Sequence, residues 1–350
     1  MMFDGPPSDL GYPSMADVAE TRPIDIGIDD TDPTDMVGLT LSDTNLRLEE
    51  LCGSGGTGEV YRAKDLETGA MSAVKVLRPG RDRKLMTDEV RVLGDIDSPW
   101  VVHSRSFGLM PDGAPWMSME YLPGRSLRRA LEEQGPIEPL RVLGWMQQVC
   151  RGLSQTHAKG WVHRDIKPDN LLLVEEGDEE RIVIIDFGIA DRIDAQPRDL
   201  SGTPDYIAPE QALRKPVDLR SDLYSLACCA YELLTGQRPV SSSDVQSKID
   251  THVDGVRLKW PDTCVVPVPL RRLLEHCMAL HPNNRPASAR ALELELERCR
   301  VQIARASSEW RFVAPTSRGR HAPVPRVNTL VGHPGVAGRD ADTLVARASA

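Results

Sequence analysis

The sequence lacks the features that mark several classes of protein. Its seven cysteines include no Cys-x-x-Cys pair, and Cys228 and Cys229 are adjacent, which argues against a disulfide framework or a zinc site. No apolar run approaches the roughly 18–20 residues that a membrane helix needs. The first residues show no basic segment followed by an apolar one, as a secretory signal would. We therefore expect a protein of a reducing, cytoplasmic compartment without membrane insertion.

Positive charge is scarce at one end of the chain and abundant at the other. Residues 1–45 contain ten acidic residues against one base, Arg22, whereas residues 299–350 contain eight arginines against three acids. Both segments are predicted to be disordered tails, because neither can bury much apolar surface. The net charge of −10 argues against a nucleic-acid partner. Residues 46–298 are left as the globular part.

The predicted secondary structure of the globular part changes along its length. Residues 46–121 contain short β-like runs and one helical stretch, Arg83–Leu93, whereas residues 122–298 are mostly helical. The β-like runs are Val60–Lys64, Met71–Leu77, Val101–Gly108 and Trp116–Tyr121, and the longest helical stripes are Leu140–Lys159 and Asp222–Leu234. This order predicts an α+β fold with a small β-rich N-terminal lobe and a larger helical C-terminal lobe. A cleft between two lobes is a favoured ligand site.

A glycine-rich segment follows the first apolar run. It reads Gly53-Ser54-Gly55-Gly56-Thr57-Gly58-Glu59-Val60 and fits the pattern G-x-G-x-x-G-x-V. Glycines let a backbone approach phosphate oxygens and offer them N–H donors, although an ordinary hairpin explains the pattern equally well by itself. No Lys-Ser/Thr follows the last glycine, and the next residues read as a strand, so neither a P-loop nor a dinucleotide fold is indicated.

A lysine lies inside the apolar strand Ala73-Val74-Lys75-Val76. A buried ammonium is costly unless it is paired, so Lys75 either points to solvent from an edge strand or is held by a carboxylate beside phosphate groups. Glu89, in the helical stretch that follows, is the best-placed partner. Asp88 is the alternative, but it lies one residue, about 100°, around the helix.

The most specific motif is a charged stretch between apolar segments, His163-Arg164-Asp165-Ile166-Lys167-Pro168-Asp169-Asn170. Its groups suit a catalytic loop from which water is excluded. Asp165 can accept a hydroxyl proton, Lys167 can face a transferred phosphate, and the Asn170 amide oxygen can bind a cation. Further along, an apolar strand ends in Asp186-Phe187-Gly188, where the carboxylate provides the hard oxygen that Mg²⁺ prefers.

Ala208-Pro209-Glu210 follows these motifs in the chain. These motifs occur in the same order along the chain as in the eukaryotic-type (Hanks-type) serine/threonine protein kinases, and the sequence therefore resembles that family. Details around Gly58 and Glu210 resemble its bacterial branch. The resemblance covers residues 46–297. It implies the bilobal kinase fold, ATP and Mg²⁺ as cofactors, and transfer of the γ-phosphate to Ser/Thr hydroxyls of protein substrates, with autophosphorylation.

The resemblance also implies roles for single residues. Those for catalysis are Lys75, Asp165 and Lys167, and those for the metal are Asn170 and Asp186. Those for ATP are Cys52, Gly53, Ser54, Gly55, Gly56, Thr57, Gly58, Glu59, Val60, Ala73, Lys75, Glu89, the gatekeeper Met119, and the hinge residues Glu120 and Leu122. Asp222 is expected to brace the catalytic loop, and Glu210 and Arg285 to form a structural ion pair. Cys52 is interpreted as apolar filler at a strand end, with a redox-sensitive thiol as the alternative.

Two other classes of function compete with this reading. A pseudokinase scaffold would be supported by loss of Lys75, Asp165, Asn170 or Asp186, and all four are present. A small-molecule phosphotransferase would share the Asp165 and Asn170 pair, but such proteins usually lack an Ala-Pro-Glu segment. No motif identifies the protein substrates or an oligomeric state.

The segment after Asp186 has few hydroxyl groups. Residues 187–200 contain no Ser, Thr or Tyr, and Ser201 is the first hydroxyl, two residues before Thr203. In the family, a phosphothreonine in this segment commonly pairs with the arginine that Arg164 matches, so Arg164, Asp199, Ser201 and Thr203 are the predicted regulatory set. Our hypothesis is that Asp199 supplies a permanent negative charge to Arg164. The alternative is that phosphorylation of Ser201 is the switch.

Overall fold

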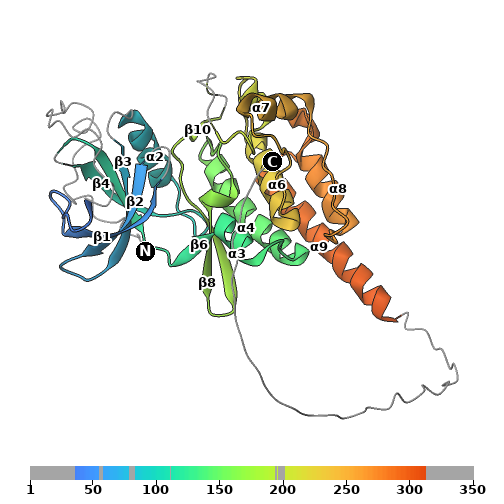
Figure 1. The fold of residues 1–350 in the computed structure, drawn as a ribbon, viewed down its shortest axis with the longest axis horizontal. Coiled ribbons are helices and arrows are strands. Elements are labelled where there is room, and N and C mark those ends of the chain that lie inside the picture. Colours follow the sequence, from blue (N-terminus) through green and yellow to red (C-terminus); the bar gives the residue numbers. More distant parts are fainter. Residues whose placement is uncertain are drawn as a thin grey trace, which may run out of the picture. The chain divides into compact units, whose positions relative to one another are not determined.

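A computed structural model of the chain describes residues 36–54, 58–78, 83–110, 112–193, 195 and 202–312. Within this part, a sheet with one helix is followed by a larger helical lobe (Figure 1). This is the two-lobe α+β architecture that the sequence predicts. Both lobes belong to the compact unit Met1–Ser308. Of the remaining unit, Glu309–Ala350, the described part is the end of the last helix.

The N-terminal lobe is a five-stranded antiparallel sheet in the order β1-β2-β3-β5-β4. Its strands are β1 (Leu46–Ser54), β2 (Gly58–Asp65), β3 (Met71–Leu77), β4 (Ser104–Leu109) and β5 (Pro115–Glu120). Alternate residues of a strand share a face, so Tyr61, Val74 and Trp116 are buried together in one apolar cluster. The helix α2 (Arg83–Asp95) packs against β4 and β5.

Residues before β1 also belong to this lobe. Thr40 forms a β-bridge with Arg47, the Leu41 N–H donates to the Leu46 carbonyl at 2.9 Å, and Leu41 is 1% exposed. The expected end of the tail at residue 45 is therefore wrong, because the Leu41 side chain closes the end of the apolar cluster. Residues 1–35 of the expected acidic tail lie outside the described residues.

The larger lobe is mainly helical, with small strands around the catalytic loop. Its helices are α3 (Leu127–Gln134), α4 (Pro139–Ala158), η2 (Pro168–Asn170), α5 (Pro209–Ala212), α6 (Arg220–Thr235), α7 (Val245–Asp254), α8 (Val268–Cys277), η3 (Pro282–Asn284) and α9 (Ala289–Phe312). Its strands are β6 (Gly124–Ser126), β7 (Trp161–Val162), β8 (Leu171–Glu176), β9 (Glu179–Ile184) and β10 (Asp191–Arg192), in the antiparallel groups β6-β8-β9 and β10-β7. None of the helices in the described ranges combines the length and apolar character that a membrane crossing requires.

Helix α6 is the centre of the larger lobe. Every residue from 221 to 235 is buried, and the helix packs against α4 and α8. It ends at Thr235, and Gly236, whose φ is +71°, forms a left-handed C-cap. An ion pair between Glu210 and Arg285 is buried nearby, with guanidinium–carboxylate distances of 2.7 and 2.9 Å. Asp222, in the first turn of this fixed helix, is therefore a rigid support for whatever it contacts.

Helix α9 extends beyond the expected end of the globular part. It continues to Phe312, and Cys299 and Ile303 are buried in the core of the larger lobe. Arg300 donates to the Gln147 side-chain oxygen at 2.5 Å. The expected boundary at residue 298 is therefore wrong, because apolar residues four apart continue the helix face that packs on the lobe. Residues 313–350 lie outside the described residues.

This corrected boundary predicts a difference in stability between two neighbouring positions. Ile303 is 8% exposed and Val301 is 40% exposed. Ile303→Ala should lower the free energy of unfolding by about 2 kcal/mol, because it leaves a cavity under the helix. Val301→Ala, the matched control, should change it by less than about 0.5 kcal/mol. Chemical denaturation measures both, and equal small effects would contradict the packing of α9.

Candidate active site

Lys75 lies in the middle of the N-terminal sheet, on the face opposite the apolar cluster. It pairs with Val60 of β2 and Met117 of β5, so its backbone position is fixed on both sides. Its ammonium contacts both Glu89 carboxylate oxygens, at 2.9 and 2.8 Å, and the Asp186 Oδ1 at 2.7 Å. The side chain is 6% exposed. The structure thus brings the lysine to the buried Glu89 carboxylate and the partly exposed Asp186 carboxylate rather than to solvent.

Glu89 reaches Lys75 because of how α2 packs. Met86, Val90 and Leu93 of this helix are buried against the core, and Glu89 lies beside them with 2% exposure. Its Oε1 also accepts from the Phe187 N–H at 3.2 Å, so it ties the lysine to the chain that follows Asp186. The alternative partner, Asp88, instead forms an ion pair with Arg91 at 3.6 Å.

Asp186 follows strand β9 and turns its carboxylate towards Lys75. The strand is fixed up to Ile184, whose N–H donates to Trp100 and whose carbonyl accepts from Val102. Asp186 itself has a φ of +65°, a left-handed conformation that is costly for a residue with a Cβ and is typical of functional sites. Its side chain is 38% exposed, so one side of the carboxylate is accessible.

The charges of this cluster stabilise one another. Burial alone lowers the pKa of Lys75, but the Glu89 and Asp186 carboxylates outweigh burial and hold that pKa above its ordinary value. Burial also raises the pKa of Asp186, and the Lys75 ammonium reverses this, so the net pKa lies below its usual range. Asp186 is therefore an anion at neutral pH, as a metal ligand must be.

The backbone of the catalytic loop is held by hydrogen bonds to the Asp222 carboxylate. Its two oxygens accept from the His163 and Arg164 N–H groups at 2.9 and 2.8 Å, as the sequence predicts. The same carboxylate lies 2.8 Å from the His157 Nε2, so this histidine is a hydrogen-bonded core residue. Arg164 has a φ of +70°, and the bonds to Asp222 hold its backbone in this strained conformation.

Both oxygens of the Asp165 carboxylate accept hydrogen bonds. Oδ1 accepts from the Thr203 N–H at 3.0 Å and from its hydroxyl at 2.8 Å. Oδ2 accepts from the Lys167 ammonium at 2.6 Å and from the Asn170 amide at 3.2 Å. Lys167 also donates to the Thr203 hydroxyl at 3.0 Å, which joins the four residues in one network. A hydroxyl group can therefore donate to this carboxylate in the folded protein.

Asn170 and Asp186 are linked through the backbone. The Ile185 N–H donates to the Asn170 carbonyl at 2.9 Å, so the two residues come from adjacent segments. The Asn170 amide nitrogen donates to the Asp165 carbonyl at 2.9 Å, which leaves its side-chain oxygen as a ligand atom. An amide oxygen and an ionised, accessible carboxylate are donors that suit a hard divalent cation. The residues present therefore fit a metal bound between these two segments.

Comparison with known proteins agrees with this geometry. Residues 46–296 match the family model described as protein kinase domain. The chain belongs to the protein kinase family. The predicted fold class and the resemblance to bacterial eukaryotic-type serine/threonine kinases are thereby confirmed, and the family uses ATP together with a divalent metal.

Several bacterial kinases are similar to this chain over most of its length. Serine/threonine-protein kinase pkn3 of Myxococcus xanthus is 33% identical over 317 residues, which is 84% of this chain and 57% of pkn3. PkaA of Streptomyces coelicolor is 32% identical, covering 77% of this chain and 54% of PkaA. PknL of Mycobacterium tuberculosis is 31% identical, covering 82% of this chain and 73% of PknL. The kinase therefore spans about half the length of pkn3 and PkaA.

The glycine-rich segment of the kinase connects β1 and β2. Gly58 is required by close packing, because a Cβ there would lie 2.2 Å from the Val76 carbonyl oxygen. Arg78 donates to Glu59 and to Ser54, both at 2.7 Å, and so joins the two strands that flank the segment. The sequence gives no signal for this role of Arg78, since it depends on the hairpin register. Of the predicted ATP-binding residues, Gly55, Gly56 and Thr57 lie outside the described residues.

Cys52 does not pack as the filler that the sequence predicts. It is exposed, next to Gly53, with its sulfur 3.8 Å from the Glu50 carbonyl. The pKa of its thiol lies above its ordinary value, chiefly through partial desolvation and further through the Glu50 carboxylate. A raised thiol pKa opposes the thiolate form, so the alternative of a redox-sensitive thiol gains no support either.

The predicted hinge residues lie at the end of β5. Met119 is 8% exposed and pairs with Ala73 of β3, while Val60 lies on the neighbouring strand. The Glu120 N–H donates to the His103 carbonyl at 2.9 Å, so this N–H is not available to a nucleotide. The prediction that the hinge backbone binds adenine therefore depends on other groups, such as those of Leu122.

The structure describes two of the four predicted regulatory residues, Arg164 and Thr203. Thr203 contacts Asp165, as described above, and Arg164 forms a 3.1 Å ion pair with Asp191 in β10. Asp199 and Ser201 lie outside the described residues. The sequence predicts this role for Asp199, and only the pairing of β10 with β7 shows that Asp191 is near Arg164.

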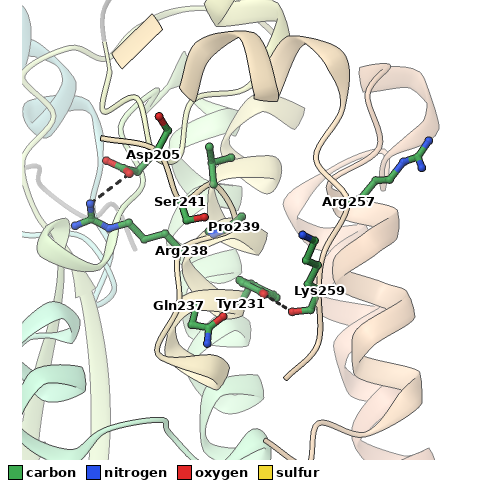
Figure 2. A pocket seen from close by; sticks show the side chains of 10 residues that line it. Asp205, Tyr231, Gln237, Arg238, Pro239, Ser241, Arg257 and Lys259 are labelled. Atoms are coloured by element: carbon green, nitrogen blue, oxygen red, sulfur yellow. Dashed lines mark hydrogen bonds and ion pairs between the residues drawn. The ribbon is translucent and has the colours of Figure 1, made fainter. Parts of the chain in front are cut away.

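A cavity of about 450 Å³ lies next to the turn that carries Thr203. Figure 2 shows Arg238 reaching Asp205, at 3.3 Å, and the Tyr231 hydroxyl donating to the Lys259 carbonyl. The cavity is lined by Asp205, Tyr231, Gln237, Arg238, Pro239, Val240, Ser241, Ser242, Arg257 and Lys259. Its three cations outnumber its single carboxylate, so the cavity favours negatively charged groups beside the catalytic segment.

The cluster of Lys75, Glu89 and Asp186, called here the lysine cluster, leads to a direct prediction for the kinase. Lys75→Met should lower phosphotransfer by on the order of 10²-fold or more, because it removes the positive charge that faces the phosphates. Lys64→Met on the neighbouring strand is the matched control and should keep wild-type activity. Circular dichroism should show the wild-type fold for both proteins. Near-normal autophosphorylation by Lys75→Met would refute the role of this lysine.

Proposed function

We propose that this chain is a serine/threonine protein kinase that transfers the γ-phosphate of ATP to hydroxyl groups of protein substrates. The observation that carries the proposal is the network around Asp165, in which Lys167, Asn170 and Thr203 converge on one carboxylate. This arrangement can orient a hydroxyl and accept its proton while an ammonium stands beside it. The relatives' printed names support serine and threonine as the acceptors.

The ATP site in this proposal is organised by the lysine cluster. Lys75, held by Glu89, would orient the α- and β-phosphates, and the segment from Gly53 to Val60 would cover them. Asp186 and the Asn170 side-chain oxygen would hold Mg²⁺, which supplies positive charge to the phosphate oxygens. Catalysis then consists mainly of positioning and electrostatic stabilisation.

Asp165 and Lys167 would act on the acceptor side. The carboxylate would take the position of hydrogen-bond acceptor for the substrate hydroxyl, as it does for Thr203. Lys167, 2.6 Å from the same carboxylate, would neutralise charge on the transferred phosphate. The burial of both groups strengthens these interactions, because their side chains are 14% and 22% exposed.

A pseudokinase scaffold is less well supported. Such a protein commonly has a broken catalytic set, whereas here Lys75 contacts Glu89 and Asp186 directly. The strained backbone at Arg164 and Asp186 also argues for chemistry, since a scaffold does not need it.

Phosphotransfer can be tested with the purified chain, labelled ATP and a cell lysate. We expect labelled proteins with Mg²⁺, none after chelation, and a loss of at least about 10²-fold for Asp165→Asn, because the proton acceptor is removed. Asp178→Asn, an exposed carboxylate on the β8–β9 turn, is the matched control. Equal labelling by wild type and Asp165→Asn would contradict the proposed function.

Autophosphorylation of the terminal segments is a separate expectation. Thr31 and Thr34 on the acidic side and Thr316 and Ser317 on the basic side are hydroxyls of the predicted tails that lie outside the described residues, whereas Ser42, the fifth candidate, is an exposed residue in the turn after the buried Leu41. We expect phosphate on at least one of them after incubation with ATP, because chain segments without a packed core reach an active site easily. Mass spectrometry that finds phosphate only within 46–297 would oppose this expectation.

A further inference from the structure

Arg164 is held by a carboxylate from the segment that follows the metal-binding motif. Its guanidinium lies 3.1 Å from the Asp191 Oδ2, and the two side chains are 10% and 9% exposed. The other Asp191 oxygen accepts from the Arg192 N–H at 2.9 Å. Both carboxylate oxygens are therefore in hydrogen bonds, and the aspartate is fixed on its own strand as well as across to the loop.

The position of Asp191 follows from a short strand pair. Asp191 is opposite Val162 and Arg192 is opposite Trp161, so β10 runs along the two residues that lead into the catalytic loop. The Arg192 guanidinium also stacks on the Trp161 ring, at 3.8 Å from its centroid. This pairing sets the carboxylate at the point where the chain turns towards Asp165.

Arg164 is well placed to transmit an effect to catalysis. Its backbone is strained, with a φ of +70°, and the next residue is Asp165. The N–H is held by Asp222 and the carbonyl accepts from Gln211 at 3.0 Å. The side chain supplies a third attachment, through Asp191. A guanidinium remains charged when it is buried, so loss of the Asp191 carboxylate would remove an ionic partner from this turn.

We propose that Asp191 is a positioning residue for phosphotransfer: it fixes Arg164, and through Arg164 the orientation of Asp165, with a carboxylate that belongs to the polypeptide. This inference rests on the proposed kinase activity and deepens it. It gives the loop a permanent negative partner, so that activity does not depend on a phosphate group in the activation segment. The contact of Asp191 with Arg164 is observed, whereas the predicted partner Asp199 lies outside the described residues.

Steady-state kinetics with three variants tests the proposal. Asp191→Asn keeps the shape and removes the charge, Asp191→Glu keeps the charge, and Asp178→Asn removes a charge from an exposed turn. We expect Asp191→Asn to lower kcat by about tenfold or more, with the KM for ATP within about twofold, since the loop orients the acceptor and not the nucleotide. Asp191→Glu should restore part of kcat, and Asp178→Asn should match wild type.

A double-mutant cycle separates positioning through Arg164 from a general role in strand pairing. Arg164→Gln should lower kcat as Asp191→Asn does, and the double variant should be no worse than either single variant, because both remove the same contact. Multiplicative losses would overturn the proposal. Should Asp191→Asn fail to fold, Arg164→Gln and Asp191→Glu still report on the pair.

The requirement for phosphate is tested with Ser201→Ala and with phosphatase-treated wild type in short assays. Retained activity in both supports the proposal, and loss of activity in either overturns it. Failure of the proposed function is recognised separately, because wild type would then show no phosphotransfer at all. If wild type is active and Asp191→Asn is equally active, only the proposed positioning role of Asp191 is contradicted.

Discussion

The active site depends on one buried ammonium group between two carboxylates. Lys75 comes from the N-terminal sheet, Glu89 from helix α2, and Asp186 from the end of β9 in the larger lobe. Neither Lys75 nor Glu89 would be tolerated in its position without an opposite charge, since a buried unpaired charge is far more costly than a buried pair, whereas Asp186 keeps one accessible side. The cluster therefore fixes three segments at once. In the proposed function, these contacts set the geometry of the ATP site.

The catalytic loop, which carries Asp165, is held in place for a different reason. Two residues next to the chemistry, Arg164 and Asp186, have left-handed backbone conformations that local preference opposes. They persist because surrounding hydrogen bonds outweigh the strain, notably those from Asp222 at the start of α6. Since α6 is buried along almost its whole length, the catalytic loop rests on the most firmly packed helix of the lobe. Strain at the site is thus stabilised by packing away from it.

Much of this arrangement could be predicted from the sequence, because the chemistry is carried by contiguous motifs. Asp165, Lys167 and Asn170 lie within six residues, so their proximity needs little knowledge of the fold. Lys75 and Glu89 could be paired because a buried lysine requires a carboxylate and few were available. The strand Met71–Leu77 has the bounds that the sequence predicts, and the helix predicted at Leu140–Lys159 is observed one residue earlier at both ends.

The errors arose where long-range packing decides. Leu41 and Ile303 were assigned to tails because their neighbours are polar or basic, although both are buried in the structure. The contact between Arg164 and Asp191 depends on the register of β10 with β7, two strands too short to have a sequence pattern. Arg78 could not be identified for the same reason, since its two partners are 19 and 24 residues away in the chain.

The central claim is that Asp186, held ionised by Lys75, binds the divalent metal that accompanies ATP. Calorimetric titration of wild type and Asp186→Asn with ATP, in the presence and absence of Mg²⁺, tests it most directly. The account predicts that Mg²⁺ raises the ATP affinity of wild type by about tenfold or more, and that Asp186→Asn loses this dependence while it keeps the fold. An Asp186→Asn protein with the full Mg²⁺ dependence of wild type would contradict the account.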